Sequence, residues 1–165
     1  MILHAGLVAV RQGGAWRGAL IEGPSGAGKS DLALRALEAG FRLVSDDRTI
    51  VWRSAARLFG RAPGPLAGLV ELRGQGVLAE PVIAMAEIAL AVVCAPPGAD
   101  LDRTPAADTR LIDGVAIPRV TLIALEPSAC AKLRRALAHL GAPGQQAYQA
   151  PSLGGGDRAG TGDTN

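Results

Sequence analysis

The sequence predicts an α/β fold built around a phosphate-binding loop. Apolar stretches of strand length alternate with two segments whose apolar residues recur at helical spacing. The glycine-rich string at 23–30 joins one of those strands directly to the first helix, which is the arrangement that P-loop folds require. A chain of 165 residues is long enough for one domain with a substantial core, and too short for two.

The first elements surround the glycine-rich loop. Residues 2–10 and 16–22 are rich in Val, Leu and Ile and predict two strands joined by a turn at Gln12-Gly-Gly-Ala. The helix expected from Ser30 has about ten residues and would be capped by Gly40. After it we predict, in order, a short strand at 41–45, a hairpin of 50–52 with 56–59, and a Gly- and Pro-rich loop at 60–76 with a possible strand at 69–72.

The second half predicts fewer strands and one more helix. We expect one or two strands within 83–94, a loop at 96–105, and a strand pair over 115–125 interrupted by Pro118. Residues 129–140 predict a helix with Ser128 as its N-cap and Gly141 as its stop. Residues 141–165 contain too few apolar side chains to offset the entropy of ordering, so we predict a disordered tail after a folded domain at 1–140.

Composition excludes several classes of protein. The net charge is only +2 and the arginines are scattered, which gives no electrostatic case for binding nucleic acid. No stretch approaches the ~18 apolar residues of a membrane helix, and the N-terminus lacks the basic region of a signal peptide. Cys94 and Cys130 match no metal-binding spacing, so we interpret them as small buried side chains in a reducing compartment. A cytoplasmic protein without a membrane or nucleic-acid partner is expected.

The string at 23–30 fits the P-loop pattern G-x-x-x-x-G-K-[ST] at every specified position. Its glycines let backbone N–H groups converge on phosphate oxygens, next to the partial positive charge at the helix start. Lys29 would neutralise the β- and γ-phosphates of a nucleoside triphosphate, and the Ser30 hydroxyl would ligate Mg²⁺. The residues predicted to hold the nucleotide are Gly23, Pro24, Ser25, Gly26, Ala27, Gly28, Lys29 and Ser30.

Three further sites carry acidic or imidazole groups. Asp46 and Asp47 end the strand after the P-loop helix, where open α/β sheets bind ligands, so one could bind metal and the other accept a proton. Their alternative role is to start a turn. The string Glu71-Leu-Arg-Gly-Gln-Gly76 suggests a loop close to a ligand, with an exposed Glu–Arg pair as the alternative. His4, taken alone, is typical of a structural or exposed histidine, and His139 of a solvated position near a helix end.

Together these segments resemble the catalytic domain of bacterial HPr kinase/phosphorylase. The similar features are His4 followed by a small residue, the strand–loop–helix of 20–37, Gly40-Phe-Arg-Leu-Val-Ser-Asp-Asp47 and the string at 71–76. They occur in the family's order over roughly residues 3–140. The P-loop alone would not separate kinases from ATPases or GTPases, whereas the string ending at Asp47 does. The resemblance implies a mixed sheet with flanking helices, related to phosphoenolpyruvate carboxykinase.

The resemblance also implies an activity, which is ATP- and Mg²⁺-dependent phosphorylation of a serine on HPr, the small carrier protein of the phosphotransferase system. Asp47 then becomes the general base, and His4 and Lys29 become active-site residues near the phosphates. Ser30 and Glu71 become Mg²⁺ ligands. Asp46, from its position at the strand end, is a further candidate for binding metal. The segment Leu101-Asp-Arg103 is similar to the family's Asp-Arg pair, which makes Arg103 a candidate catalytic arginine.

The chain also departs from the family pattern. It starts close to His4, so we expect a short form without the family's N-terminal regulatory domain. The family's arginine-rich string, associated with dephosphorylation, should fall around 121–129, which contains no arginine, so the sequence supports a kinase more than a phosphorylase. An ATP-sensing regulatory module and a small-molecule kinase are the alternatives. The resemblance suggests a hexamer, to which the aliphatic segment 82–93 could contribute.

Overall fold

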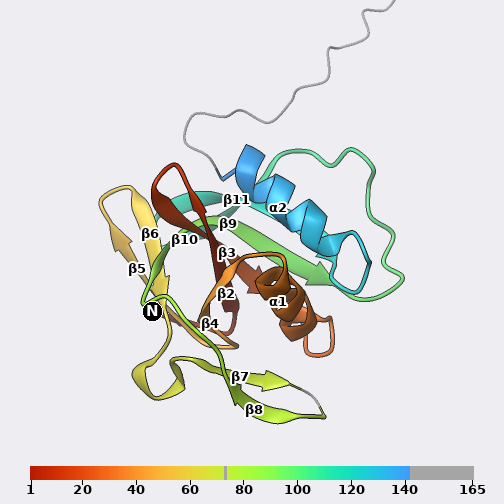
Figure 1. The fold of residues 1–165 in the computed structure, drawn as a ribbon. Coiled ribbons are helices and arrows are strands. Elements are labelled where there is room, and N and C mark those ends of the chain that lie inside the picture. Colours follow the sequence, from red (N-terminus) through yellow and green to blue (C-terminus); the bar gives the residue numbers. More distant parts are fainter. Residues whose placement is uncertain (73, 142–165) are drawn as a thin grey trace, which may run out of the picture.

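A mixed β-sheet runs through the computed structural model, which describes residues 1–72 and 74–141 (Figure 1). Within those ranges the sheet has nine strands: β1 (Ile2–Leu3), β2 (Gly6–Gln12), β3 (Ala15–Glu22), β4 (Arg42–Ser45), β5 (Thr49–Ser54), β6 (Arg57–Arg61), β9 (Ala86–Ala95), β10 (Asp108–Ile112) and β11 (Val115–Ile123). A separate two-stranded sheet is formed by β7 (Leu69–Leu72) and β8 (Gly76–Ala79), after the short 3₁₀ helix η1 (Gly64–Leu66). The helices are α1 (Lys29–Glu38) and α2 (Ala129–His139).

The central strand is β9, and its pairing determines where the loops of the sheet meet. Strand β9 runs parallel to β3 on one side. On its other side it pairs antiparallel with β6 at its start and parallel with β11 at its end. The parallel strands β3, β9 and β11 therefore end at the same edge of the sheet. This is the edge at which α/β folds bind ligands, and it carries both the glycine-rich loop after β3 and the loop between β11 and α2.

Two apolar clusters fill the two faces of this sheet. The first lies under both helices, where Leu32 of α1 and Leu133 of α2 pack against inward residues such as Ile21. The second lies on the other face, where Leu20 and Leu58 are buried within the curl made by β5, β6 and β10. Neighbouring residues of β3 enter opposite clusters, as the two-residue period of a strand requires. Strand β3 is thus buried on both faces, which fixes the position of the loop that follows it.

Most of the predicted elements are confirmed, and the mixed sheet with flanking helices is the predicted fold class. Helix α1 has the predicted ten residues, and Gly40, with φ of +90°, follows its last turn. Both predicted hairpins, β2–β3 and β5–β6, are present. Ser128 stands at the N-cap of α2, although its side chain makes no capping hydrogen bond. The predicted tail at 141–165 lies outside the described residues except for Gly141.

Two expectations about strands were wrong. The single strand predicted at 2–10 is two strands, because β1 pairs with β5 whereas β2 pairs with β3 and β4. Strands β8 and β10 cover segments to which the sequence assigned no element: β8 is wholly exposed, and Ile112 is the one buried residue of β10. Pro118 does not interrupt β11: it opposes Thr109 at a non-hydrogen-bonded position of the β10–β11 hairpin, and pairing with β9 begins only at Arg119.

The sequence also offered the aliphatic segment 82–93 as a possible contributor to a homo-oligomer, which stays a prediction. Most of it belongs to β9 and is buried in the sheet, leaving Val82 and Met85 as its exposed large apolar residues.

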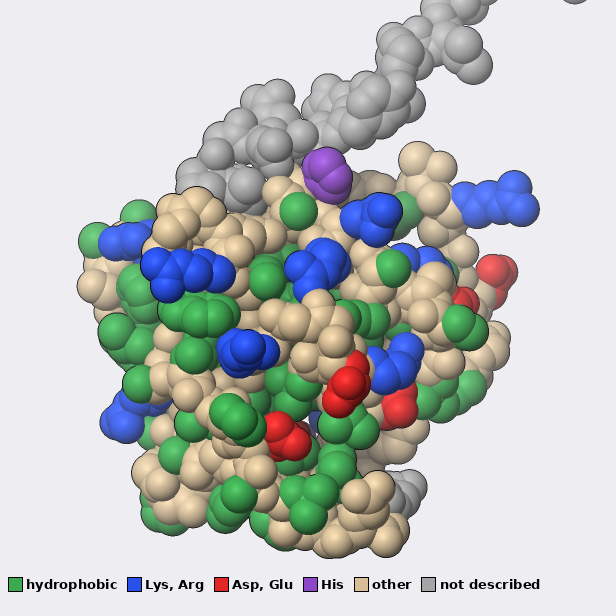
Figure 2. Space-filling model, in the orientation of Figure 1, with side chains coloured by type: hydrophobic (Ala, Val, Ile, Leu, Met, Phe, Trp, Pro, Cys, Tyr) green, Lys and Arg blue, Asp and Glu red, His purple; other side chains and the backbone are tan. Residues whose placement is uncertain are grey.

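On the face drawn in Figure 2, Lys and Arg side chains are spread among neutral ones rather than gathered in one patch. None of the helices in the described ranges is long and apolar enough to cross a membrane.

Candidate active site

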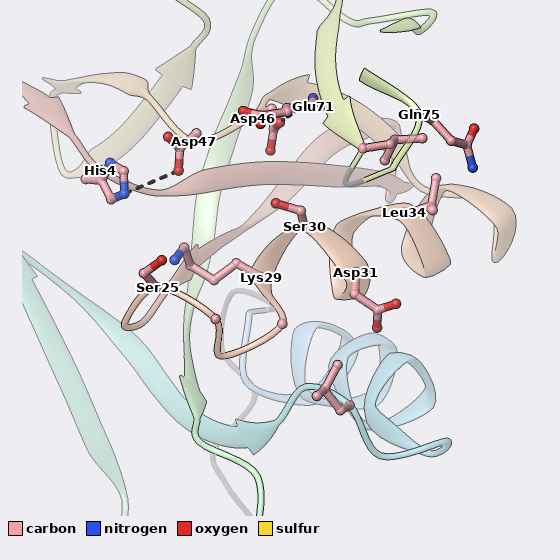
Figure 3. Close-up of a pocket in the computed structure, with 14 residues that line it drawn as sticks. His4, Ser25, Lys29, Ser30, Asp31, Leu34, Asp46, Asp47, Glu71 and Gln75 are labelled. Atoms are coloured by element: carbon pink, nitrogen blue, oxygen red, sulfur yellow. Dashed lines mark hydrogen bonds and ion pairs between the residues drawn. The ribbon is translucent and has the colours of Figure 1, made fainter. Parts of the chain in front are cut away.

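A cavity of about 600 Å³ opens at the end of β3, beside the first turn of α1 (Figure 3). Its walls come from five segments distant in sequence: the β1–β2 junction, the glycine-rich loop with α1, the β4–β5 turn, the β7–β8 hairpin and the loop after β11. The residues that line it are His4, Ser25, Gly26, Gly28, Lys29, Ser30, Asp31, Leu34, Asp46, Asp47, Glu71, Leu72, Gln75 and Leu125. This volume is typical of a small-molecule site.

Two positions of the glycine-rich loop require glycine, because each has a positive φ and no room for a Cβ atom. At Gly23, with φ of +143°, a Cβ would lie 2.7 Å from the backbone oxygen of Cys94. At Gly28, with φ of +90°, a Cβ would lie 2.9 Å from Cδ2 of Leu125. Beneath the loop, burial raises the pKa of the Cys94 thiol to about 11, so this buried side chain stays protonated at neutral pH. The close packing holds the loop open above α1, with the helix N-terminus directed at the cavity.

The side chain of Lys29 folds back toward the glycine-rich loop. Its Nζ donates hydrogen bonds to the carbonyl oxygens of Gly23, at 3.0 Å, and Pro24, at 3.1 Å. An ammonium group has three donors, so one remains for a ligand in the cavity. The positive charge is therefore held at the mouth of the loop, next to the helix N-terminus, where a polyphosphate would meet both.

His4 and Asp47 lie beside each other on the opposite wall. Nε2 of His4 lies 3.3 Å from Oδ1 of Asp47, and their side chains are 65% and 59% exposed. Asp47 has φ of +55°, a left-handed conformation that aspartate tolerates better than most residues. In Figure 3 the pair faces Ser25 and Lys29 across the cavity, with Ser30 further along α1. An exposed carboxylate thus stands opposite the phosphate-binding loop.

A buried hydroxyl pair positions these groups. Oγ of Ser45 and Oγ1 of Thr49 lie 2.6 Å apart across the base of the β4–β5 turn, and Oγ1 of Thr49 donates to the carbonyl of Ala5 at 2.7 Å. Both residues are buried. The pair ties the turn that carries Asp47 to the residue that follows His4. The sequence reasoning missed these two hydroxyls, because single polar residues next to a strand end give no distinctive pattern.

Asp46 points away from its neighbour and is more enclosed. Its Oδ2 accepts a hydrogen bond from the backbone N–H of Glu71 at 3.1 Å, which joins the β4–β5 turn to β7. Burial raises the pKa of the Asp46 carboxyl above its ordinary value of 3.8, and the nearby Asp47 and Glu71 carboxylates add to the rise, whereas the Glu71 N–H opposes it. A cation bound nearby would stabilise the charged form of this carboxylate, which is desolvated and lies near two others.

With this geometry in place, the comparison with known families identifies the fold. Residues 1–86 match the family model described as HPr Serine kinase C-terminal domain, which is more than half of the chain. This chain belongs to that family. The HPr kinase/phosphorylase of Limosilactobacillus reuteri is 36% identical over 116 residues, which cover 64% of this chain and 36% of that protein. The HPr kinase/phosphorylase of Lactiplantibacillus plantarum is 45% identical over 62 residues, which cover 37% of this chain and 20% of that protein.

The chain therefore spans about a third of the first of these relatives and about a fifth of the second. Among solved structures, the HPr(Ser) kinase/phosphatase from Coxiella burnetii matches with a TM-score of 0.67 and 24% identity, covering 82% of this chain and 96% of that one. This likeness supports the HPr kinase fold for the strands and helices described above. The predicted resemblance to the family is confirmed.

The cavity brings together most of the residues predicted for an HPr kinase site. Those that line it are His4, Ser25, Gly26, Gly28, Lys29, Ser30, Asp46, Asp47 and Glu71. Gly23 and Pro24 contribute the carbonyls that hold Lys29, and Ala27 is buried. Arg103 is exposed in the loop between β9 and β10 and does not line the cavity. The sequence reasoning did not single out Asp31, Leu34 or Leu125 for the site, and it included Leu72 and Gln75 only as members of the string at 71–76.

The predicted metal residues fit Mg²⁺ only in company with a nucleotide. Ser30, Asp46 and Glu71 share the cavity, yet within residues 1–72 and 74–141 no cluster of three or more His, Cys, Asp or Glu could hold a metal alone. Mg²⁺ commonly takes one or two carboxylates and completes its octahedron with waters and phosphate oxygens. The hydroxyl of Ser30 and the carboxylates of Asp46 and Glu71 match this mode of coordination.

Replacing Asp46 by asparagine should stabilise the protein and weaken MgATP binding at the same time. Because the folded-state pKa is raised, the charged carboxylate costs stability above that pKa, and the cost disappears below the ordinary value of 3.8. Asp46→Asn should therefore raise the melting temperature at pH 7, with the advantage shrinking as the pH falls. MgATP affinity should drop at least about tenfold, as for other groups that tune metal sites. Thermal unfolding and calorimetry measure both.

Asp100→Asn, at an exposed loop position, is the matched control and should change neither quantity. A lower melting temperature for Asp46→Asn at pH 7 would contradict the argument, since asparagine retains an oxygen to accept the Glu71 N–H.

Proposed function

We propose that this protein is an ATP- and Mg²⁺-dependent protein-serine kinase whose acceptor is an HPr-like phosphocarrier protein. The observation that carries the proposal is the His4–Asp47 pair, which faces the P-loop lysine across one cavity. Membership of the HPr serine kinase C-terminal domain family, and relatives named HPr kinase/phosphorylase, support the same acceptor. ATP and such carriers occur in the cytoplasm, where we place a signalling role for this reaction.

Each group has a defined task in the proposed reaction. Asp47 accepts the proton of the acceptor serine as the serine oxygen bonds to the γ-phosphorus and the bond from that phosphorus to the bridging oxygen breaks. His4 holds the carboxylate of Asp47 in place. Lys29 and the N–H groups of the P-loop neutralise phosphate charge and keep the triphosphate in line. Mg²⁺, held by Ser30, Asp46 and Glu71, would supply further neutralisation at the β- and γ-oxygens.

The exposure of the base favours a protein acceptor over the alternatives. A small-molecule kinase gains by enclosing its acceptor, whereas the Asp47 side chain is 59% exposed and open to a bulky partner. An ATP sensor has no use for a carboxylate positioned opposite the phosphate loop. We also propose the kinase direction rather than the phosphorylase direction, because the loop after β11 brings Leu125, and no arginine, to the cavity. A homo-oligomer, a hexamer by family resemblance, remains part of the proposal.

The test is phosphoryl transfer to HPr. Full-length protein incubated with ATP, Mg²⁺ and purified HPr should yield one phosphoserine on HPr, located by mass spectrometry. Lys29→Ala should reduce transfer at least about a hundredfold, because it removes the charge that neutralises the phosphates. Lys132→Ala is the matched control: Lys132 is the chain's other lysine, on α2 in an ion pair with Glu126, and its loss should leave transfer unchanged. Tight ATP binding without transfer to HPr would refute the kinase proposal.

A further inference from the structure

Leu125 is a half-exposed leucine at the rim of the P-loop cavity. It lies just after β11, its side chain lines the cavity, and the residue is 49% exposed. Its Cδ2 is the atom that leaves no room for a Cβ on Gly28. An apolar side chain that touches a phosphate-binding loop and still faces the cavity has a free surface available to a ligand.

The loop that carries Leu125 is clamped to α1. Arg35 of α1 donates through Nη2 to the carbonyl of Ala124 and through Nη1 to the carbonyl of Glu126, at 3.1 Å, the two residues that flank the leucine. The guanidinium is itself fixed by Asp31, whose Oδ2 accepts from Nε at 2.9 Å. Leu125 is therefore held at a set place relative to the P-loop, although half of it is exposed.

The groups that would carry out transfer lie on the other side of the P-loop. Asp46, Asp47 and Glu71 belong to the β4–β5 turn and β7, whereas the connection from β11 to α2 lies across α1 from them (Figures 1 and 3). The γ-phosphate must face Asp47 for transfer to occur. A triphosphate bound along the P-loop would then direct its nucleoside away from that wall, toward the β11–α2 loop.

We infer that Leu125 is the surface on which the nucleoside of the bound triphosphate packs, and that Arg35 is the residue that positions it. The inference rests on the proposed function, because it assumes a nucleoside triphosphate on the P-loop. Nucleoside sites are mostly apolar with a few polar groups, and a leucine fits this pattern. A leucine offers no hydrogen bond to a base edge, so Leu125 contributes affinity rather than selection among bases.

The test compares a ligand that has a nucleoside with one that lacks it. Calorimetry on the full chain measures the affinities for MgATP and for magnesium tripolyphosphate. Leu125→Ser should weaken MgATP about tenfold, the effect of losing one apolar contact surface, and leave tripolyphosphate unchanged. Leu125→Met, which keeps an apolar surface, should restore MgATP affinity. Arg35→Ala should weaken MgATP alone. Leu111→Ser is the matched control, since Leu111 is 64% exposed on β10 and does not line the cavity.

Three results would overturn the inference while leaving the proposed function intact: equal affinity of the wild-type protein for the two ligands, unchanged MgATP affinity in Leu125→Ser, or equal losses for both ligands in that variant. Loss of MgATP affinity in Leu34→Ser but not in Leu125→Ser would also overturn it, because the nucleoside would then lie along α1 and β7. If the wild-type protein bound neither ligand, the proposed function and this inference would both be wrong.

Discussion

Replacing Asp47 by asparagine should lower phosphoryl transfer by about 10²- to 10⁴-fold, the range expected when a general base is removed. MgATP affinity should stay within about twofold of the wild-type value, because Asp47 is proposed to contact the acceptor serine rather than the phosphates. Asparagine has nearly the same shape as aspartate and keeps an oxygen beside His4, but it cannot take up a proton. Transfer rates to HPr under single-turnover conditions, with calorimetric titration of MgATP, measure both quantities.

The conformation of Asp47 makes asparagine the informative substitution. With φ of +55° the residue is in the left-handed region, where asparagine and aspartate are both tolerated and alanine adds strain. Asp113 supplies a matched control, because it is an exposed aspartate with φ of +48° in the β10–β11 turn and does not line the cavity. Asp113→Asn should leave transfer unaltered. Full activity in Asp47→Asn would remove Asp47 from the role of base.

The parts of the site that could be predicted depend on local pattern. The P-loop and its helix require glycines, a lysine and a helical repeat within one short stretch, and α1 starts where that pattern places it. Asp46 and Asp47 are adjacent in sequence and end a strand whose apolar run is visible. Each of these features is specified by residues that are neighbours in the chain, so the sequence contains the information directly.

The parts that could not be predicted depend on long-range pairing. His4 meets Asp47 because β1 leaves the β2–β3 hairpin to pair with β5, and the continuous apolar run at 2–10 conceals that break. Leu125 reaches the P-loop because β11 lies parallel to β9, a register that a single sequence does not reveal. Strand β10 has a single buried residue, Ile112, at its end, so its buried face is too short to produce an alternating pattern. Tertiary contacts, rather than propensity, decide these elements.

Gly28→Ala should destabilise the protein by about 2–5 kcal/mol, the sum of left-handed strain and overpacking, and should abolish MgATP binding. The added Cβ would lie 2.9 Å from Cδ2 of Leu125 and 3.1 Å from Cβ of Ala124, and φ at this position is +90°. Either the loop after β11 or the start of α1 must move, and movement of the helix start redirects the N–H groups that hold the phosphates. Chemical denaturation and calorimetry measure the two effects.

Gly26→Ala separates strain from crowding. Gly26 has φ of +82°, close to that of Gly28, but a Cβ there would meet nothing within 4 Å. Its destabilisation should therefore be the strain alone, about 1–2 kcal/mol. Adding Leu125→Ala to Gly28→Ala should recover part of the lost stability, because it removes the atom nearest to the new Cβ. Equal destabilisation by Gly26→Ala and Gly28→Ala would mean that the contact between Leu125 and the P-loop does not constrain Gly28. If Gly28→Ala destabilises the protein more than Gly26→Ala, the difference between the two free energies of unfolding measures the cost of crowding Leu125.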